Sequence, residues 1–432
     1  MRVLVVGAGG REHALASMCA LSGRATKLFT APGNAGMAEL AEILPIAATD
    51  TDALATAVRE HQIDLVIVGP DAALEAGVVD ACDAAGAKVF GPTKAAARIE
   101  SSKVFAKQLM DEAGIATARW WATSSADRQE LIEFAKARDG RVAVKADGLA
   151  LGKGVTVCDS MSAVEAAVAS CFDERKHGQA GDVVIVEELL SGREVSVFAI
   201  CDGTRAWLLP PACDYKRAYD GDLGPNTGGM GSYSPPMGVA VDALLDFVAA
   251  CIITPCLTAL RERETPFRGC LYAGLMLTAQ DPQVIEFNAR FGDPETQVLL
   301  PMLDATQLFD LLATAATGEL GTDGRVRARS DSTAGVTVVA AGQDYPASGS
   351  YGAAIDLPAE QPENTVIFHA GTARDADGTL RTSGGRVLAI TATGADLAAA
   401  RARAYDLLAQ IHFEGIRWRR DIAAPAPEHA GQ

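Results

Sequence analysis

The sequence predicts a mixed fold of α/β and α+β class, with an open parallel α/β domain first, a two-lobed domain next and a small β-rich domain last. The length supports several domains, because 432 residues exceed one ordinary core and typical domains have about 100–200 residues. Short β-rich runs alternate with helical stretches in the first 101 residues. The order of β runs and helical stretches changes at Arg141 and again after the polar stretch 321–332, which indicates two further structural boundaries.

The N-terminal domain is expected to cover residues 1–101. Four apolar runs alternate there with helical stretches, and each run ends in Gly or Pro, as in an open parallel sheet. The expected strands are residues 3–6, 27–30, 65–68 and 88–90.

The middle domain is expected over residues 102–325 and begins with an amphipathic helix at 103–113. A small lid lobe at about 122–192 follows, in which short β runs surround one helix. A larger lobe completes the domain, with helices rich in Ala and Leu around 242–260. The expected strands are residues 142–145, 155–157 and 183–186 in the lid lobe, and 195–201, 272–278 and 284–287 in the larger lobe.

The C-terminal domain is expected over residues 326–422, where short strands and turns precede one helix at 394–410. The tail at 423–432 is rich in Pro and Ala, and we expect it to be disordered. The expected strands are residues 335–340, 365–369 and 386–391.

Composition and charge narrow the class of function. Hydrophobic residues make up 49% and charged residues 22% of the chain, which is typical of a soluble globular protein. A net charge of -17 disfavours nucleic acid and anionic membranes as partners. The nine cysteines form no C-x-x-C pair, and no uncharged apolar run of about 18 residues occurs. The first residues read as a strand and a glycine turn, so we do not expect them to be a signal peptide. We therefore expect a cytoplasmic protein. We further expect small-molecule partners and a monomer or weak homodimer, which composition does not decide.

A glycine-rich turn follows the first expected strand and opens a helix. The run from Gly7 to Glu12 presents backbone N–H groups and a helix dipole that favour an anion. A nicotinamide site would need glycine at Glu12 and an acidic residue after the second strand, where 30–32 reads Thr-Ala-Pro. Two more turns, 31–36 and 69–71, end neighbouring strands. Together the three loops predict a site for a small phosphorylated substrate, and plain tight βα turns are the alternative.

A second glycine-rich loop, from Lys145 to Gly154, has residues suited to phosphates, because glycines let backbone N–H groups approach and lysines neutralise charge. It is not a Walker A motif, since three residues rather than four separate Gly148 from Gly152-Lys153, and no Ser or Thr follows. The loop lies between two short β runs. We therefore expect a flexible lid over ATP.

Charged residues beside these β runs suggest further nucleotide contacts. Lys145 ends an apolar run, where a lysine is either a solvated strand end or a buried cation that awaits an anion, and we favour the buried cation. Glu187, Glu188 and Leu190 follow the run 183–186, in a position to read an adenine edge, with Glu194 reaching the ribose. A charged hinge is the alternative for this segment.

An oxygen pair and a cation recur at alternate positions from Glu286 to Arg290. Because side chains alternate along a strand, Glu286, Asn288 and Arg290 are expected to project from one face. Buried together, the oxygen atoms would favour Mg²⁺, which prefers oxygen ligands and would bridge the phosphates of ATP. A solvated face of an edge strand is the alternative. The six histidines are isolated, so a zinc site has little support.

Five motifs occur in order along the chain, and two more follow near its end. They read Gly-Gly-Arg-Glu-His-Ala-Leu at 9–15, Ala-Pro-Gly-Asn-Ala-Gly at 31–36, Lys-Ala-Asp-Gly-Leu-Ala at 145–150, Pro-Asn-Thr-Gly-Gly-Met-Gly at 225–231 and Glu286 through Glu295, then His-Ala-Gly-Thr at 369–372 and Gly-Gly-Arg-Val-Leu at 384–388. With this set the chain resembles the phosphoribosylamine–glycine ligase family of ATP-grasp enzymes, from Met1 to about Ile422. The family usually has Gln and His where this chain has Cys213 and Tyr215, and often Glu and Pro at Asp71 and Ala73.

The resemblance implies an ATP-grasp pair of lobes that holds ATP, with Mg²⁺ or Mn²⁺. The implied reaction joins glycine to 5-phosphoribosylamine through glycyl phosphate, giving glycinamide ribonucleotide, ADP and phosphate in de novo purine synthesis. Alternatives are another ATP-grasp carboxylate-amine ligase or carboxylase, and a nucleotide sensor without catalysis. The expected residues are Lys145, Lys153 and Arg290 for catalysis; Lys103, Lys145, Gly148, Gly152, Lys153, Gly154, Glu187, Glu188, Leu190 and Glu194 for ATP; Gly9, Gly10, Arg11, Glu12, Asn34, Gly36, Asp71, Asp214, Lys216, Asn226, Gly228, Gly229, Arg290, Gly292 and Asp293 for substrates; and Glu286 with Asn288 for the metal.

Overall fold

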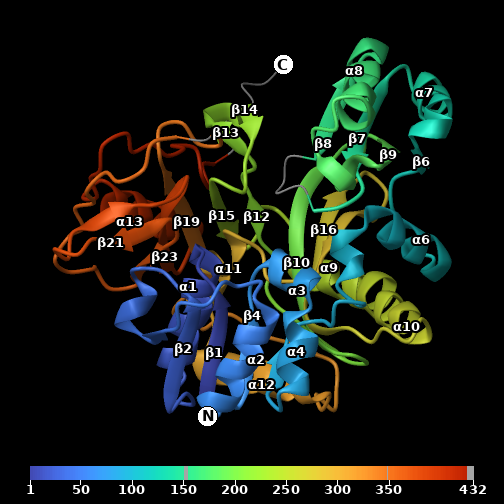
Figure 1. Cartoon of the computed structure of the whole chain (residues 1–432). Coiled ribbons are helices and arrows are strands. Elements are labelled where there is room, and N and C mark those ends of the chain that lie inside the picture. The colour runs from blue at the N-terminus through green and yellow to red at the C-terminus, as the bar shows by residue number, and fades with distance from the viewer. Residues whose placement is uncertain (150–153, 348, 426–432) are drawn as a thin grey trace.

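The computed structural model describes residues 1–149, 154–347 and 349–425. The N-terminal domain, the large lobe and the C-terminal domain pack around one another, and the lid lobe stands apart on the far side of the chain from the C-terminal domain (Figure 1). The predicted fold class is confirmed. The predicted disordered tail falls mostly on residues 426–432, which lie outside the described residues.

The N-terminal domain is a parallel sheet of order β3-β2-β1-β4-β5. Alternate residues of β1 face opposite sides, so Leu4 and Val6 pack toward α2 and α4 while Val3 and Val5 pack toward α1 and α12. All four predicted strands are present. The short β3 was not predicted, because two residues show no periodicity. The elements are β1 (Arg2–Gly7), α1 (Gly10–Leu21), β2 (Lys27–Pro32), β3 (Glu42–Ile43), α2 (Thr51–Glu60), β4 (Leu65–Val68), α3 (Asp71–Ala76), α4 (Val78–Ala84) and β5 (Lys88–Phe90).

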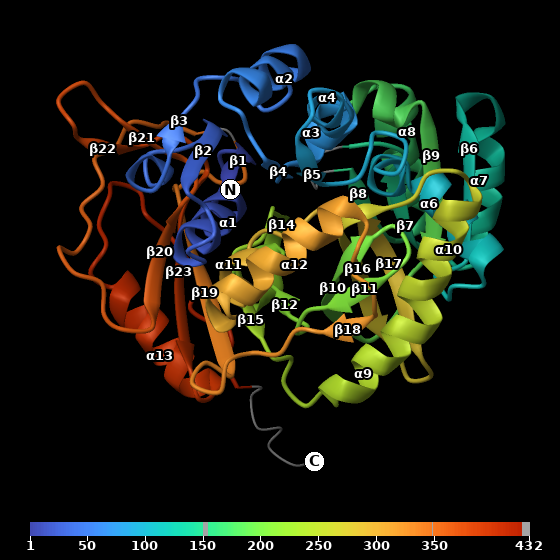
Figure 2. The same ribbon diagram turned by 90° about the horizontal axis from the view of Figure 1, so that it is seen from below.

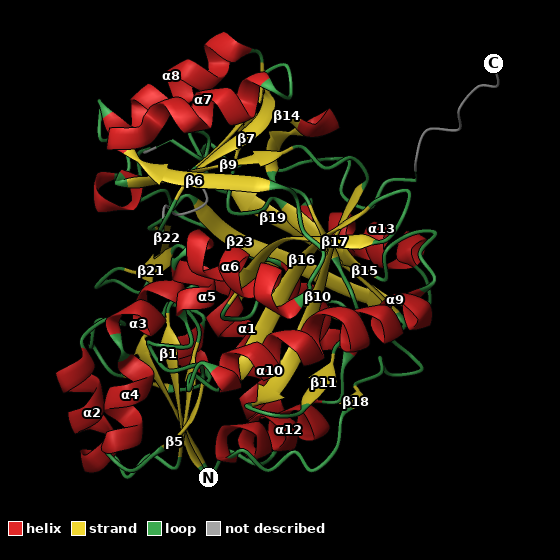
Figure 3. Ribbon diagram, turned by 90° about the vertical axis from the view of Figure 1, so that its right-hand side faces the viewer, coloured by secondary structure: helices red, strands yellow, loops and turns green. Residues whose placement is uncertain are grey.

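The lid lobe is a four-stranded sheet of order β6-β9-β7-β8, covered on one face by two helices that lie side by side (Figure 3). The one helix predicted among the β runs at 142–186 is present as α8, whereas α7, which precedes these runs, was not predicted. Helix α7 buries Leu131 and Ala135 in the core of the lid lobe. The elements are α5 (Arg98–Ser101) and α6 (Lys103–Ala113) before the lobe, then β6 (Trp120–Ser124), α7 (Arg128–Lys136), β7 (Arg141–Ala146), β8 (Val155–Asp159), α8 (Met161–Phe172) and β9 (Val183–Glu188).

The large lobe is built on a sheet of order β17-β16-β10-β11-β18. Its helical stretch Val241–Glu262 is, among the described residues, the one continuous helix long and apolar enough to cross a membrane, with a mean hydropathy of 2.0. The buried residues of this stretch pack in the same core as the sheet, as in a core helix. The elements are β10 (Arg193–Asp202), β11 (Ala206–Leu208), α9 (Val241–Val248), a π-helical turn (Ala249–Ile253), α10 (Thr254–Glu262), β16 (Arg268–Leu277), β17 (Pro282–Asn288), α11 (Glu295–Leu299), α12 (Ala305–Thr317) and β18 (Gly324–Arg325).

The C-terminal sheet has the order β12-β15-β19-β23-β20, and its first two strands come from the middle of the chain. Helix α13 covers one face, and α1 and α11 approach the other (Figure 2). The hairpin β13–β14 leaves this sheet between β12 and β15. The elements are β12 (Cys213–Asp214), β13 (Arg217–Tyr219), β14 (Leu223–Asn226), β15 (Gly231–Ser234), β19 (Ala334–Ala341), β20 (Thr365–His369), β21 (Thr372–Arg374), β22 (Leu380–Thr382), β23 (Arg386–Gly394) and α13 (Leu397–Leu408).

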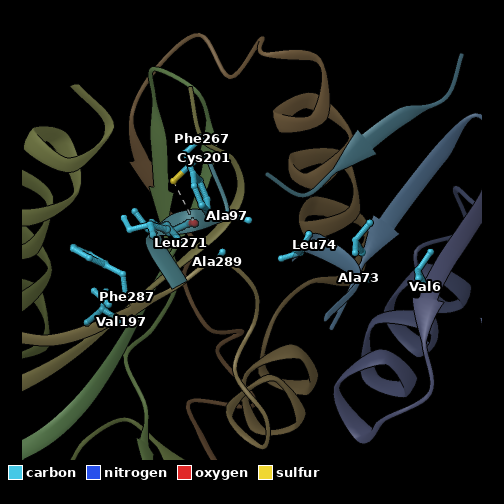
Figure 4. Close-up of a cluster of buried hydrophobic side chains, with 14 of the residues drawn as sticks. Val6, Ala73, Leu74, Ala97, Val197, Cys201, Phe267, Leu271, Phe287 and Ala289 are labelled. Atoms are coloured by element: carbon cyan, nitrogen blue, oxygen red, sulfur yellow. Dashed lines mark hydrogen bonds between the residues drawn. The ribbon is translucent and has the colours of Figure 1, made fainter. Parts of the chain in front are cut away.

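One hydrophobic cluster runs from the N-terminal domain into the large lobe. Leu74 and Val6 belong to the N-terminal side, and Phe267, Leu271 and Phe287 to the large lobe (Figure 4). Protein interiors are close-packed, so a shared cluster resists relative movement of the parts that it joins. The carboxyl ends of the N-terminal strands are therefore held at a set position relative to β17.

A pair of buried histidines joins the N-terminal and C-terminal domains. The Nδ1 atom of His13 on α1 accepts a hydrogen bond of 2.8 Å from the backbone N–H of His369, and the two ring centroids are 5.6 Å apart. Burial lowers the pKa of His13 to about 3, helped by His369, and burial lowers the pKa of His369 to about 4. Both rings are therefore neutral at neutral pH.

This junction predicts that the protein loses stability as the pH falls below about 6.5. The unfolded histidines bind protons near pH 6.5, whereas the folded ones do not. Below pH 6.5 each histidine therefore lowers the free energy of unfolding by about 1.4 kcal/mol per pH unit, until its folded pKa is reached. His13→Asn keeps an acceptor for the His369 N–H but cannot gain this charge. We expect a smaller drop in Tm between pH 7.5 and pH 5 for this variant than for the wild type. The matched variant His412→Asn alters an exposed histidine and should behave like the wild type; equal drops in all three would contradict the prediction.

Candidate active site

Two adjoining cavities lie between the lid lobe and the large lobe. The smaller one includes Lys103, Gly148 and Gly154. The larger one extends to Asp214 and Gly228, and its volume of about 760 Å³ suits small-molecule ligands. The residues common to both are Lys145, Val155, Glu187, Ile285, Glu286, Asn288 and Arg290.

A buried carboxylate holds two lysines at this shared wall. The Oε2 atom of Glu187 lies 2.9 Å from Nζ of Lys145 and 3.1 Å from Nζ of Lys107. The interpretation of Lys145 as a buried cation is confirmed, since its residue is only 5% exposed. Burial lowers the pKa of Lys107, and Glu187 opposes that shift. Two cations thus share one anion at the wall of the cavity.

Glu187 differs from its prediction in position and partners. It lies inside β9 rather than after the strand, because the ladder with β7 continues through Glu188. Its Oε1 atom is buried and has no hydrogen-bond partner among the described residues. Glu188 also lines the larger cavity, and its Oε1 atom accepts the backbone N–H of Arg119 at 3.0 Å. Glu187 therefore has one oxygen atom for its lysines and one for a donor in the cavity.

Lys103 ties the glycine-rich lid loop to α6. Its Nζ atom donates a hydrogen bond of 3.0 Å to the carbonyl of Gly148, and Asp147 accepts the backbone N–H of Val104 at 3.1 Å. Burial lowers the pKa of Lys103, against the effect of Glu286. The predicted contacts Gly152 and Lys153 lie outside the described residues.

The oxygen pair of β17 faces both cavities, as the alternation predicted. Glu286, Asn288 and Arg290 all line them, and a register shift in the β16–β17 ladder brings Ile285 into the same wall. Burial would raise the pKa of Glu286, but Lys216 and other cations lower it, so the carboxylate is charged at neutral pH. The charged Glu286 carboxylate therefore lies on the same cavity wall as Lys145.

The fit of a divalent cation rests on this donor set. In the described part of the chain, no group of three or more His, Cys, Asp or Glu side chains could hold a metal. Mg²⁺ usually takes one or two carboxylates and completes its shell with water and substrate phosphates. One carboxylate and one amide oxygen beside a phosphate-sized cavity fit a cation that arrives with a nucleotide.

Arg290 is held from behind by a buried carboxylate that the sequence did not reveal. Its Nη2 atom lies 2.9 Å from Oε1 of Glu100 and 3.3 Å from Oδ1 of Asn288. Burial raises the pKa of Glu100, and Arg290 opposes this shift. The Nε atom of Arg290 is buried without a partner among the described residues. The guanidinium thus keeps one donor free at the cavity.

The larger cavity carries most of the predicted substrate residues outside the N-terminal domain. Burial raises the pKa of Asp214 to about 7, while Lys216, 3.9 Å away, acts in the opposite direction. Lys216 also forms an ion pair with Glu194, which was expected to reach a ribose. Asn226, Gly228 and Asp293 line the same cavity, whereas Gly229 and Gly292 pack behind it against Pro294 and Glu295.

In the glycine turn after β1, one backbone donor is already used by a carboxylate of the chain, so the predicted anion site stays a prediction. The Oε2 atom of Glu12 accepts the N–H of Gly9 at 2.7 Å, and Arg11 pairs with the same carboxylate at 2.5 Å. A Cβ atom at Gly7 or Gly69 would lie within 2.3 Å of Glu12, so these glycines make room for the acid. The chain's own carboxylate therefore occupies the Gly9 donor of this turn.

Asn34 and Gly36 likewise serve the domain junction. The Asn34 amide donates to the carbonyls of Ala8 and His369, each at 2.8 Å, and accepts from Gly36 and Met37. In the described part of the chain, none of Gly9, Gly10, Arg11, Glu12, Asn34 and Gly36 lines either cavity, whereas Asp71 lines the smaller one.

Several residues at the cleft escaped prediction. Lys107 is one lysine of an amphipathic helix, and only its position on the buried face could have drawn attention to it. Glu295 was part of a motif without a role. Its Oε1 atom accepts the hydroxyl of Ser196 at 3.2 Å, beside Tyr272. The substitutions at Cys213 and Tyr215 are accommodated locally: Cys213 is buried in β12, and the Tyr215 hydroxyl accepts the N–H of Ala423 at 3.0 Å.

Two lobes that enclose a lysine-lined cleft with an oxygen pair on its floor define an enzyme of the ATP-grasp class. The chain matches three family models: phosphoribosylglycinamide synthetase, N domain, at residues 1–100; the ATP-grasp (A) domain at 101–296; and the C domain at 335–425. The chain belongs to the phosphoribosylamine–glycine ligase family, the ATP-grasp ligases of purine biosynthesis.

Known relatives of this family align with nearly the whole chain. Phosphoribosylamine–glycine ligase of Streptomyces coelicolor is 47% identical over 99% of both chains, and that of Caulobacter vibrioides is 43% identical over 98% of this chain and 97% of its own. The crystal structure of the Thermotoga maritima ligase is similar with a TM-score of 0.84 at 34% identity, covering 98% of this chain and 100% of that one. A biotin carboxylase domain of Hydrogenobacter thermophilus, at 14% identity and a TM-score of 0.74 over 96% and 91%, shares the fold alone.

Replacing Glu187 is predicted to destabilise the protein more than replacing Glu188, its neighbour in the sequence. Glu187→Gln would leave two buried lysines around a neutral amide, and breaking a buried ion pair costs about 3–5 kcal/mol. Glu188→Gln at the next position should cost less than about 1 kcal/mol, because its carboxylate is partly exposed. Thermal unfolding of both variants without nucleotide measures the difference. Similar losses in the two variants would contradict this account of the site.

Proposed function

We propose that this chain uses ATP to phosphorylate the carboxylate of glycine and then joins the glycyl group to the amine of 5-phosphoribosylamine. The products are glycinamide ribonucleotide, ADP and phosphate. One observation carries the proposal: the two cavities meet at a wall that holds Lys145, Glu286, Asn288 and Arg290. A phosphoryl group at this wall would face a nucleotide on one side and an acceptor on the other.

The smaller cavity and the lid strands form the nucleotide side in this proposal. Lys103, Lys145 and Gly148 would surround the phosphates, and Lys153 would join them from the lid loop. The unpaired Oε1 atom of Glu187 supports a contact with a ligand donor, such as the adenine amino group. Leu190 and Glu188 line the neighbouring wall, which suits a flat base.

Glu286 and Asn288 would hold the divalent cation, which we propose to be Mg²⁺, with Mn²⁺ as a substitute. A bound cation of this kind supplies charge neutralisation at the phosphates. The protein's own part is to keep the Glu286 carboxylate charged and to add the fixed positive charges of Lys145 and Arg290. Such preorganised charges act most strongly where water is excluded.

The reaction itself needs no covalent bond to the enzyme. A carboxylate oxygen of glycine attacks the γ-phosphorus and ADP leaves, which gives an acyl phosphate. The amine of phosphoribosylamine then attacks the acyl carbon, phosphate leaves, and the amine releases one proton. Holding the reactants in place contributes about 7–11 kcal/mol in favourable cases. The lid would also keep water away from the acyl phosphate.

The acceptor side is the larger cavity, around Asp214, Lys216, Asn226 and Asp293. This part of the proposal gives the N-terminal turns a supporting role, because Glu12 and Asn34 use their polar atoms within the protein. We further place the reaction in the cytoplasm, which the nine free cysteines support.

A carboxylase is the alternative function, and no feature of the site favours it. The carboxylase domains share the fold at 14–16% identity, which carries no information on substrate.

ADP release with defined substrates tests the proposal. We expect ADP to form only when glycine and phosphoribosylamine are both present, the latter generated in place from ribose 5-phosphate and ammonia. Bicarbonate or formate in place of glycine should give no ADP above background. ADP formation with bicarbonate and without glycine would instead establish a carboxylase.

The cation site yields a separate prediction. Glu286→Gln removes the charge but keeps the shape, and losing about 2.7 kcal/mol of charge stabilisation would slow ADP formation roughly 100-fold. A chelator should stop the wild-type reaction, and added Mg²⁺ should restore it. The control Glu262→Gln, at an exposed position on α10, should keep wild-type activity. Full activity of Glu286→Gln would refute the metal assignment.

A further inference from the structure

The motif Gly-Gly-Arg at 384–386 has no part in the reaction described so far, yet its arginine reaches the rim of the cleft. The Nη1 atom of Arg386 donates to the carbonyl of Gly228 at 2.6 Å and to the carbonyl of Asp293 at 3.0 Å. Its Nη2 atom lies 2.8 Å from Oδ2 of Asp293. One guanidinium at the start of β23 thus joins two loops that are far apart in the sequence.

A tyrosine of the same domain holds the other end of the Gly228 peptide. The N–H of Gly228 donates to the hydroxyl of Tyr345 at 2.8 Å. A Cβ atom at Gly385 would lie 2.4 Å from the Tyr345 ring, so glycine beside Arg386 makes room for the tyrosine. Both polar atoms of the Gly228 backbone are therefore fixed by side chains of the C-terminal domain.

The two loops lie on the acceptor side of the cleft. Gly228 and Asp293 line the larger cavity but not the smaller one, and neither Arg386 nor Tyr345 lines either. The Oδ1 atom of Asp293 accepts from Gln297 at 2.7 Å, so both of its oxygen atoms are used within the protein. Burial would raise the pKa of Asp293, but Arg386 lowers it, which keeps this anchor charged.

We propose that Arg386 and Tyr345 are positioning residues that fix the segment Asn226–Gly228 and the loop at Asp293 for the binding of phosphoribosylamine. This inference rests on the proposed function. The C-terminal domain thereby shapes a binding surface without touching the reacting atoms. If these contacts only held the domains together, their loss would lower stability but would not affect the binding of one substrate more than another.

Steady-state kinetics with each substrate varied in turn tests the proposal. Arg386→Gln loses charge-assisted hydrogen bonds, and we expect the KM for phosphoribosylamine to rise about tenfold or more, with KM for ATP and glycine changed less than about twofold. Arg386→Lys should recover part of the loss, because it keeps the charge beside Asp293. Tyr345→Phe removes one hydrogen bond and should raise the same KM about two- to fivefold.

The control is Arg403→Gln, since among the described residues Arg403 bonds only the carbonyl of Thr393, within the C-terminal domain. It should keep all three KM values. Equal rises for ATP and phosphoribosylamine, or unchanged KM values in both Arg386→Gln and Tyr345→Phe, would overturn the proposal. If Arg386→Gln fails to fold, Tyr345→Phe decides alone. Wild-type protein that forms no ADP with glycine and phosphoribosylamine refutes the proposed function itself, and the inference falls with it.

Discussion

The carboxylate of Glu187 is the contact on which the architecture of the cleft depends. It draws Lys145 from β7 and Lys107 from α6 to a single oxygen atom, so the sheet of the lid lobe and the helix before it share one buried anchor. Two cations share this one anion, and the Glu286 carboxylate on the same wall also interacts with Lys145. In the proposed function, a phosphate at this wall would give the lysines a further anionic partner.

The overall charge of the protein makes such local arrangement necessary. A chain with a net charge of -17 repels phosphates at long range, and salt screens that repulsion beyond about 8–10 Å. Within the cleft, Lys103, Lys216 and Arg290 lie near Glu286 and hold its pKa below the ordinary value despite burial. In the proposed function, the same few side chains would attract the nucleotide and bind its cation.

The domains around the cleft play different structural roles. The N-terminal domain shares a core with the large lobe and presents Asp71 to the smaller cavity. The C-terminal sheet includes β12 and β15 from the middle of the chain, so the loop that carries Asp214 and Lys216 is built into that sheet. Cleft geometry on the acceptor side consequently depends on the C-terminal domain. The lid lobe makes its own small core and is the part least tied to the others.

The sequence alone determined the features that follow from local periodicity and chemistry. The four longer strands of the N-terminal sheet, the common face of Glu286 and Asn288, and the burial of Lys145 were all predictable, because each depends on a few adjacent residues. Tertiary structure decided what depends on residues far apart in the chain. Lys107 reaches Glu187, and Arg386 reaches Gly228. Sequence patterns report which groups need partners, but only the packed chain decides whether the protein or a ligand supplies them.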